Sequence, residues 1–417
     1  MAFLHRSSSV LAILCLYVLT FCDARISKRR VVTTPCIPDG HWVDTWTAMP
    51  QLTEYTNLPP PPYRKTKNTS TVIFYNSTIR QTLHTSTGAS QIRIRISNAF
   101  GLTDLPITAV TIALPYNGSA GVSAIQPSTL QTVTFSGGEA SIVIPDGALA
   151  VSDPLDFPVE PQSMVTVTMY LATGQEGTYI TSHPGSRDTS WMTLGNQVGA
   201  INLTGPSLNS TAHWWPDLLL SRLQSSNDPM LTSLAVSNQA AGGNRILEDG
   251  LGPSVLSRID RDVLSHAGVK YAMIYEGVND IGTADATIAN QTVTYNRLIS
   301  AYKQIAMRIH AFNIPLFAAT ITPFSAPNGN TTLQPYTSSL REQTRQKVND
   351  FIRTSGTFDA VLDFDAVVRN QTVPSQLADA LQSGDYLHPN EAGYQLLTDS
   401  FDLTLFAKYA NGVGGFV

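Results

Sequence analysis

Hydrophobic and polar residues alternate with a period of two along the first half of the chain. The clearest runs are residues 91–97 and 165–169, and residues 105–114 and 141–144 add further β-rich segments. A period of two places one face of a strand toward a core and the other toward solvent. Glycine-containing turn sequences separate these runs, and no helical period is long enough to predict a helix. The pattern therefore predicts an antiparallel β-sandwich domain over residues 41–200.

The pattern changes after about Gly205, where short apolar strands alternate with amphipathic helices. The expected strands are residues 231–236, 269–275, 314–321 and 360–364, and the expected helices are residues 218–223, 254–265, 296–312, 337–352 and 391–406. Strands separated by helices predict a parallel sheet with helices on both faces. The fold class is therefore α/β, with a three-layer α/β/α domain over residues 205–412 behind the β-sandwich domain.

The N-terminus has the features of a secretory signal, predicted over residues 1–24. A basic start with His5 and Arg6 precedes an apolar run over residues 10–21, and Ala24 stands at a suitable cleavage point. The run is too short to span a bilayer, and no later run reaches spanning length. Residues 25–40 are expected to be a processed or flexible segment, in which Lys28-Arg29-Arg30 is either a second processing site or a solvated basic tail. We expect a secreted, extracellular protein without a membrane span.

The cysteines and the glycosylation sequons agree with secretion. Cys15 and Cys22 would leave with the signal, so Cys36 would stand alone and no disulfide framework is expected. Acceptor sequences for N-glycosylation, Asn-x-Ser/Thr, occur at Asn68, Asn76, Asn117, Asn202, Asn209, Asn290, Asn330 and Asn370.

Charge excludes one class of partner. The net charge is −5 and charged residues make up 14% of the 417 residues, so no basic field is available to bind phosphate backbones, and we expect no nucleic-acid partner. His183, His266 and His310 lack the spacing of metal ligands, and no metal site is predicted.

Polar residues follow the expected parallel strands in three loops. Residues 238–245 include Gly242-Gly243, whose N–H groups are suited to an oxyanion but also to a tight turn. Asn279 offers either an amide donor or an Asx turn. Asp385 and His388, three residues apart, form either an acid–base pair or a helix cap. Loops at the carboxyl ends of parallel strands meet in one crevice, so together they predict a hydrolytic site.

The chain resembles the SGNH hydrolases, also called GDSL-type esterases, over nearly all of its length. Residues 238–247, 277–282 and 385–390 are similar to the second, third and fifth sequence blocks of that family. The resemblance implies that Gly243 and Asn279 form the oxyanion hole. It also implies that His388 is the base and Asp385 the acid that orients it. Residues 41–48 and 97–101 resemble secreted members that carry a β-sandwich before the catalytic domain.

The chain departs from this family at the first block, which carries a Gly-Asp-Ser nucleophile. No Gly-Asp-Ser occurs, yet Trp215 to Leu219 resembles the helix that follows the serine loop, and His213-Trp214 resembles the lead into the preceding strand. We therefore expect the first strand and its nucleophile loop to be absent, with the gap beside Trp214. No replacement nucleophile is found, because Ser207, Ser210, Ser233 and Ser237 lack a glycine-flanked turn.

Three explanations remain for this gap: an error in the coding sequence, a splice variant, and a true pseudoenzyme. The resemblance implies a secreted acyl- or acetyl-esterase that needs no metal or cofactor and acts on a small-molecule or polysaccharide ester. A monomer is expected. Without the serine block this chain is expected to be inactive. The alternative is a secreted carbohydrate-binding protein without catalytic activity.

Overall fold

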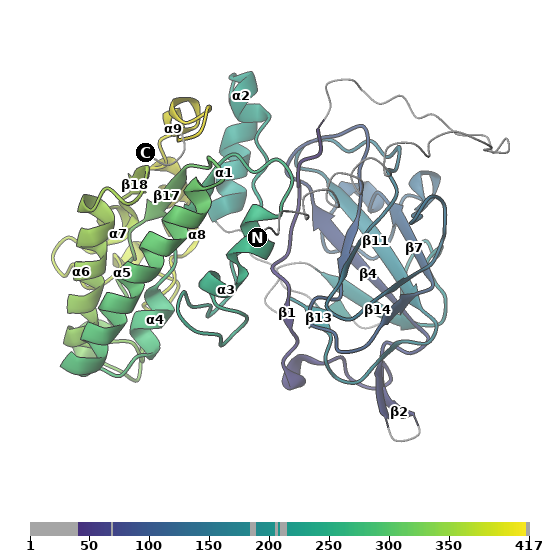
Figure 1. Ribbon diagram of the computed structural model, residues 1–417, viewed down its shortest axis with the longest axis horizontal. Coiled ribbons are helices and arrows are strands. Elements are labelled where there is room, and N and C mark those ends of the chain that lie inside the picture. The colour runs from purple at the N-terminus through teal and green to yellow at the C-terminus, as the bar shows by residue number, and fades with distance from the viewer. Residues whose placement is uncertain (1–40, 68–69, 184–188, 205–206, 209–214, 414–417) are drawn as a thin grey trace, which may run out of the picture. The chain divides into compact units, whose positions relative to one another are not determined.

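The computed structural model describes residues 41–67, 70–183, 189–204, 207–208 and 215–413 (Figure 1). Its described residues from Val43 onward belong to one compact unit. The expected signal peptide, the basic segment at residues 28–30 and Cys36 lie outside the described residues, as do Asn68, Asn209, Ser210, His213 and Trp214.

Antiparallel strands make up the first half of the described chain. They are β1 (Gln51–Leu52), β2 (Arg64–Lys67), β3 (Ser70–Ile73), β4 (Ser77–His84), β5 (Arg95–Ser97), β6 (Leu105–Ile107), β7 (Ala109–Ala113), β8 (Gln131–Thr132), β9 (Ile142–Ile144), β10 (Leu149–Val151), β11 (Met164–Leu171), β12 (Gln175–Glu176), β13 (Thr181–Ser182), β14 (Ser190–Leu194) and β15 (Ser207–Leu208). Single 3-10 turns lie at Tyr55–Asn57, Tyr116–Gly118 and Pro127–Thr129.

The largest sheet in this half has the order β15-β14-β4-β11-β7-β8. Its central pair aligns Met164 with His84 and Leu171 with Ser77, so β4 and β11 pair along their full length. Val110, Ile112, Val165 and Val167 join Phe135 and Phe157 in a buried apolar cluster. The expected antiparallel pairing is confirmed. Two- and three-stranded sheets, however, are found where one continuous second layer is expected.

Helices and parallel strands alternate in the second half. The helices are α1 (Trp215–Gln224), α2 (Pro229–Thr232), α3 (Val255–Ile259), the π-helical η4 (Asp260–Leu264), α4 (Val278–Thr283), α5 (Ile288–His310), α6 (Ser339–Thr354), α7 (Phe364–Val368), α8 (Glu391–Asp399) and α9 (Thr404–Lys408). The strands are β16 (Ala272–Ile274), β17 (Leu316–Ala319) and β18 (Ala360–Leu362), and 3-10 turns lie at Pro327–Gly329 and Asp379–Leu381.

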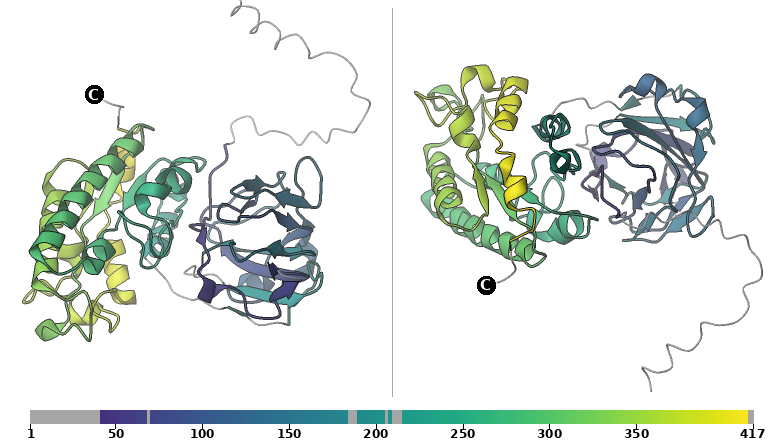
Figure 2. Two further views of the ribbon diagram at one scale, coloured as in Figure 1. Left: turned by 60° about the horizontal axis from the view of Figure 1, so that its bottom comes forward. Right: turned by 90° about the horizontal axis from the view of Figure 1, so that it is seen from above.

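The parallel strands pair in the order β16-β17-β18, with helices on both faces (Figure 2). Alternate residues of β17 point to opposite sides: Leu316 and Ala318 enter one buried cluster, and Phe317 and Ala319 enter the other. The first cluster takes its helical residues from α3, α4, α5 and α6, and the second from α1, α2, α7, α8 and α9. The prediction of a three-layer α/β/α arrangement is confirmed.

The predicted strand over residues 231–236 is wrong. Residues 229–232 form α2, whose start is fixed because Asp228 accepts a hydrogen bond from Met230 N and Pro229 occupies the first turn. Residues 234–236 follow without strand pairing. Instead, the carbonyls of Thr232 and Leu234 accept hydrogen bonds from Gln224 Nε2 at 3.0 and 3.4 Å. In the described residues β16 pairs with β17 alone, so these carbonyls have no neighbouring strand and bind a side chain instead.

Several other predicted bounds shift. Residues 254–265 divide into α3 and η4, and the closing helix divides into α8 and α9 around Ser400. The long helix begins at Ile288, eight residues earlier than expected, because Thr287 caps it by accepting a hydrogen bond from Asn290 N. Its expected inner face is confirmed, since Leu298, Tyr302, Ile305 and Ile309 are all buried.

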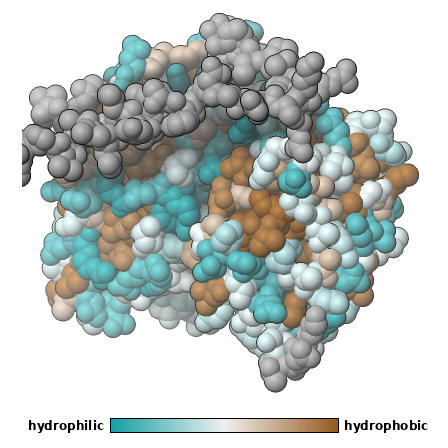
Figure 3. All heavy atoms as spheres, turned by 45° about the vertical axis from the view of Figure 1, so that its right-hand side comes forward, coloured by the Kyte–Doolittle hydropathy of each residue, from teal (hydrophilic) through white to brown (hydrophobic). Residues whose placement is uncertain are grey.

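The surface carries scattered apolar side chains. On the face drawn in Figure 3, hydrophobic residues form several patches separated by polar ones. Over the described part of the chain, no helix has the length and hydropathy needed to span a bilayer.

Candidate active site

Asp385 and His388 lie in the loop that leads into α8. Gly384 and Tyr386 have positive φ angles of 101° and 59°, which turn the chain back on itself. This turn brings His388 Nδ1 to 2.6 Å from Asp385 Oδ2. The second carboxylate oxygen accepts backbone hydrogen bonds from Leu387 N at 3.0 Å and His388 N at 2.9 Å. The two residues of the predicted acid–base pair are therefore hydrogen-bonded to one another, and their roles stay a prediction.

The electrostatics of this pair suit a base. Partial burial favours a neutral carboxyl, but the hydrogen bonds from the His388 ring and from two backbone N–H groups outweigh burial and lower the pKa of Asp385 to about 2. An ionised Asp385 can only accept, so Nδ1 carries the proton and Nε2 is left as the accepting nitrogen. The helix-capping alternative belongs to Asn390, whose side chain accepts a hydrogen bond from Gly393 N.

Gly243 and Asn279 lie close to one another. Gly243 has a φ of 74°, and a side chain at this position would overlap Leu251. Asn244 N donates to Ala241 O at 3.2 Å, so the Gly-Gly segment does form a tight turn. Asn279, in the first turn of α4, reaches this turn, where its Nδ2 donates to Asn244 O at 2.9 Å. The two predicted oxyanion donors thus come from two loops that are hydrogen-bonded to one another.

Asp280 fixes the position of the Gly243 loop. Its two carboxylate oxygens accept hydrogen bonds from Ile246 N at 2.9 Å and Leu247 N at 3.0 Å. Burial raises the pKa of Asp280, and these two backbone N–H groups oppose that rise only in part. Asp280 was not among the predicted site residues.

Glu276 is a second carboxyl that sequence reasoning missed. It follows β16 directly and precedes Gly277, whose φ of 118° starts the turn into α4. Burial, followed by the neighbouring Asp280 charge, raises the pKa of Glu276 to about 8, against the opposing effect of hydrogen bonds from Gly277 N and the Asn279 side chain. Glu276 is therefore mostly neutral at pH 7. A carboxyl at a strand end is the sequence signal that would have indicated it.

Three of the four serines considered as replacement nucleophiles lie in the described residues. The Ser233 hydroxyl donates to Met230 O at 2.7 Å and ends α2, and Ser237 lies 3.4 Å from Asp44 O. Ser207 belongs to β15. The His388 ring is hydrogen-bonded to Asp385 through Nδ1, and the Ser383 hydroxyl in the same loop donates to Asp385 Oδ1 at 3.0 Å.

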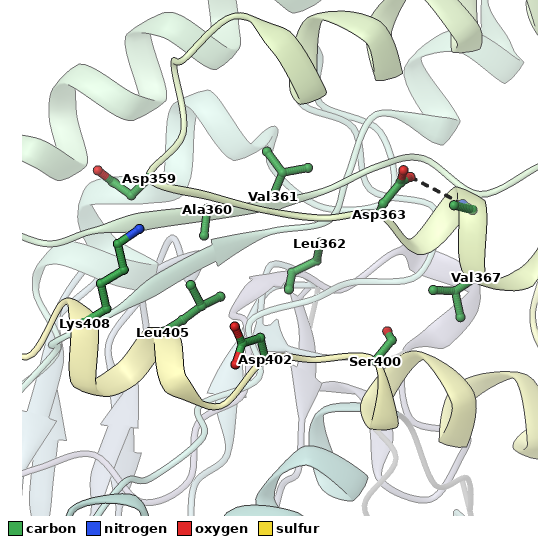
Figure 4. Close-up of a pocket in the computed structure, with 11 residues that line it drawn as sticks. Asp359, Ala360, Val361, Leu362, Asp363, Val367, Ser400, Asp402, Leu405 and Lys408 are labelled. Atoms are coloured by element: carbon green, nitrogen blue, oxygen red, sulfur yellow. Dashed lines mark hydrogen bonds between the residues drawn. The ribbon is translucent and has the colours of Figure 1, made fainter.

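Two surface hollows lie in the α/β half. One, of about 470 Å³, runs between β18 and α9, and its lining includes Asp359, Asp363, Asp402 and Lys408 (Figure 4). It contains no predicted site residue. The other, of about 500 Å³, is an open depression at the start of α8, lined by Asn390, Glu391, Ala392 and Gln395. Its first lining residue, Asn390, comes two residues after His388 in the sequence.

Predicted glycosylation and metal residues can be placed in part. Asn76, Asn117, Asn202, Asn290 and Asn330 are exposed, and Asn370 is half-buried. In the part of the chain that is described, no three His, Cys, Asp or Glu side chains group as metal ligands do.

A comparison of the sequence with models of known protein families finds a match. Residues 185–401 match the model of the GDSL-like lipase/acylhydrolase family, which is more than half of the chain. No curated protein matches the chain in sequence.

Similar solved structures include an acetylxylan esterase from Geobacillus stearothermophilus, with 14% sequence identity and a TM-score of 0.31 over 46% of this chain and 81% of that chain. A GDSL-like lipase from Bacteroides thetaiotaomicron has 16% identity and a TM-score of 0.30 over 43% of this chain and 79% of that chain. Similarity at this level identifies no substrate.

Proposed function

Because the chain belongs to the GDSL-like lipase/acylhydrolase family, we propose that its α/β half holds an ester-binding site of a secreted carboxylic ester hydrolase, and that this chain lacks the serine needed to complete catalysis. The observation that carries the proposal is the 2.6 Å contact between His388 Nδ1 and Asp385 Oδ2, which leaves Nε2 as a base.

Each retained residue has a role in this chemistry. With a serine present, His388 Nε2 takes the hydroxyl proton as the oxygen attacks the acyl carbon, and Asp385 stabilises the imidazolium. Gly243 N–H and Asn279 Nδ2 donate to the oxyanion of the tetrahedral intermediate. The described residues supply the base, the acid and the donors. Because the acyl-enzyme has no serine oxygen on which to form, little covalent catalysis is left.

Hydrolysis of a short aryl ester tests this proposal. Purified wild-type chain and His388→Ala are assayed with 4-nitrophenyl acetate at neutral pH, with Tyr271→Phe as a control whose lost hydroxyl bond to Phe406 O lies outside the site. We expect the three rates to be equal and close to the uncatalysed rate. A wild-type rate that His388→Ala abolishes and Tyr271→Phe preserves would show that this chain has a nucleophile after all.

The transcript distinguishes the explanations for the missing block. Sequencing across the codons for Trp214 and Trp215 would reveal an in-frame insert encoding Gly-Asp-Ser if this chain is a shortened form of an ordinary esterase. Consistent absence of such an insert would favour a pseudoenzyme.

Secretion, glycosylation and a monomeric state are part of the same proposal. The exposed asparagines of the sequons named above support it, since glycans need accessible acceptors. Expression in a eukaryotic secretory host, followed by enzymatic removal of N-glycans, should lower the mass of the chain found in the medium. An unchanged mass would contradict glycosylation, and light scattering of the same sample gives the oligomeric state.

The competing function is carbohydrate binding without catalysis, which the lack of a Gly-Asp-Ser sequence favours. A binding assay against acetylated and deacetylated xylan separates the two. Retention that depends on the acetyl groups and is lost in His388→Ala supports an ester site, whereas equal retention of both variants on both polymers supports a separate carbohydrate site.

A further inference from the structure

The segment between β17 and α6 runs between the base loop and the oxyanion loop. From this segment, Gln334 Nε2 donates to Asp385 O at 2.8 Å. Two residues on, the hydroxyl of Tyr336 donates to Asn279 Oδ1 at 3.1 Å. The backbone of Asp385, a member of the predicted acid–base pair, and the amide of the predicted oxyanion hole are thereby hydrogen-bonded to one short stretch of chain.

Gln334 and Tyr336 are also bonded to one another. Tyr336 N donates to Gln334 Oε1 at 3.0 Å, so both ends of the Gln334 amide are used. Gln334 is 5% exposed, and a buried amide is fixed in orientation when its oxygen and its nitrogen each have a partner. A continuous series of hydrogen bonds therefore runs from Asp385 through Gln334 and Tyr336 to Asn279, and on to Asn244.

The direction of the Tyr336 bond sets the orientation of Asn279. Burial raises the pKa of Tyr336, so its hydroxyl keeps its proton and acts as the donor. Asn279 Oδ1 is then the acceptor, and Nδ2 must face the opposite way, toward Asn244 O. That is the orientation in which the amide presents N–H groups at the turn that carries Gly243.

The segment is held in place independently of the site. The Tyr336 ring packs edge-on against Phe324 and lies so close to Gly282 that a side chain at position 282 would overlap it. Arg341 donates to Pro335 O at 2.9 Å and to Ala284 O. Rigid anchors of this kind are what a residue needs if it is to fix the orientation of another.

We propose that Gln334 and Tyr336 are positioning residues, which hold the Asn279 amide with Nδ2 toward Gly243 and keep the Asp385 loop in register with it. The inference rests on the proposed function, because it gives these residues a purpose only if Asn279 and Asp385 belong to an ester site. Neither residue is assigned contact with the reacting atoms: Tyr336 acts through Asn279, and Gln334 acts through Asp385, which orients His388.

Nuclear magnetic resonance of the free protein tests the positioning directly. The full chain is labelled with ¹⁵N, the Asn279 side-chain amide is assigned by its loss in Asn279→Ser, and the ring nitrogens of His388 are assigned by their loss in His388→Ala. Ring ¹⁵N shifts report which nitrogen carries the proton when the imidazole is neutral. Tyr336→Phe and Gln334→Leu are compared with two controls, Tyr271→Phe and Gln224→Leu, which lose a hydroxyl bond and an amide bond elsewhere in the same half.

We expect Tyr336→Phe to shift the Asn279 amide resonances and speed their exchange with solvent. We expect Gln334→Leu to change His388 from one tautomer, protonated at Nδ1, to a mixture of two. The controls should leave both signals unchanged at a similar loss of melting temperature. If both test variants give the same Asn279 and His388 signals as the controls, the positioning role is wrong. Tyr336→Phe keeps the ring and its packing, so it remains informative if Gln334→Leu does not fold.

Acetate, the smallest carboxylate product, separates failure of this inference from failure of the proposed function. Titration of the wild-type chain with acetate should shift the Gly243 and Asn279 amide signals. If they do not respond, the ester site is in doubt, while the tautomer and amide readouts of the free protein still decide whether Gln334 and Tyr336 position their partners.

Discussion

Asn279 donates to the carbonyl of Asn244 at 2.9 Å, so a side chain in the first turn of α4, which follows β16, is bonded to the backbone of a loop that no described parallel strand precedes. The loop keeps its position because Asp280 accepts from the N–H groups of Ile246 and Leu247. The segment of residues 238–247 is thus held in position by the segment of residues 277–282. This explains how the turn at Gly242-Gly243 forms even though residues 234–236 do not pair as a strand.

The raised pKa of Glu276 predicts a loss of stability with rising pH. The unfolded chain releases this proton near pH 4.5 and the folded chain near pH 8, so the folded state holds the extra proton between these values and stability falls across that window. Glu276→Gln should remove this dependence, which is on the order of a few kcal/mol at most. Urea unfolding of both proteins from pH 4 to 9 measures it.

The control for this measurement is Glu248→Gln, because Glu248 is exposed and pairs with Arg297. Its curve should stay nearly parallel to that of the wild type above pH 5. Parallel curves for Glu276→Gln as well would show that Glu276 ionises normally in the folded state.

The lowered pKa of Asp385 predicts the opposite dependence at acid pH. Its folded pKa of about 2 lies below the ordinary 3.8, so the stabilising contribution is present above pH 4 and disappears as the pH falls toward 2. Asp385→Asn should flatten the wild-type curve in this range by less than about 1 kcal/mol, since the pair is half-exposed. Asp379 is exposed, so Asp379→Asn serves as the control. An equal effect of the two variants would contradict the assignment of this pH dependence to Asp385.

The buried pair of Arg345 and Asp365 predicts a large loss of stability. Nη1 of Arg345 lies 2.6 Å from Asp365 Oδ1, and both side chains are fully buried. Arg345→Met leaves buried carboxylate charge partly unpaired and should cost about 3–5 kcal/mol. Arg297→Met, which breaks the exposed pair with Glu248, should cost under about 1 kcal/mol. Equal costs in urea unfolding would contradict the assignment of Arg345 to the core.

The edge position of β16 predicts uneven hydrogen exchange across the sheet. β17 is flanked by β16 and β18, whereas β16 pairs with β17 alone in the described residues. Alternate amides of a strand point to opposite neighbours, so those of β16 that face away from β17 should exchange faster than the amides of β17. Exchange followed by NMR tests this, and equal protection of both strands would mean that another segment covers the edge.

The sequence was sufficient to predict the elements that depend on residues close together in the chain. The inner face of α5 follows from the spacing of Leu298, Tyr302, Ile305 and Ile309, and all four are buried. The Asp385 and His388 pair could be predicted because three residues of spacing allow a tight turn to close it. Both predictions need only neighbours along the chain.

The predictions that were wrong or missing concern residues whose contacts are distant in the sequence. Residues 231–236 have a strand-like composition, but a strand forms only with a partner, and none of the described strands pairs with this segment. The sequence Asp228-Pro229, which indicates the start of a helix, was overlooked in favour of that strand. Tyr336 and Gln334 could not be predicted, because their importance lies in contacts with Asn279 and Asp385, 57 and 51 residues away.

The bonds from Gln224 to the carbonyls of Thr232 and Leu234 have a consequence for any longer form of this protein. A strand added before Trp215 could pair with the edge of β16 without displacing an existing strand from it. The hydrogen bonds from the Gln224 side chain would be replaced by backbone hydrogen bonds between strands. A longer form that contains such a strand would then share the described scaffold with this chain.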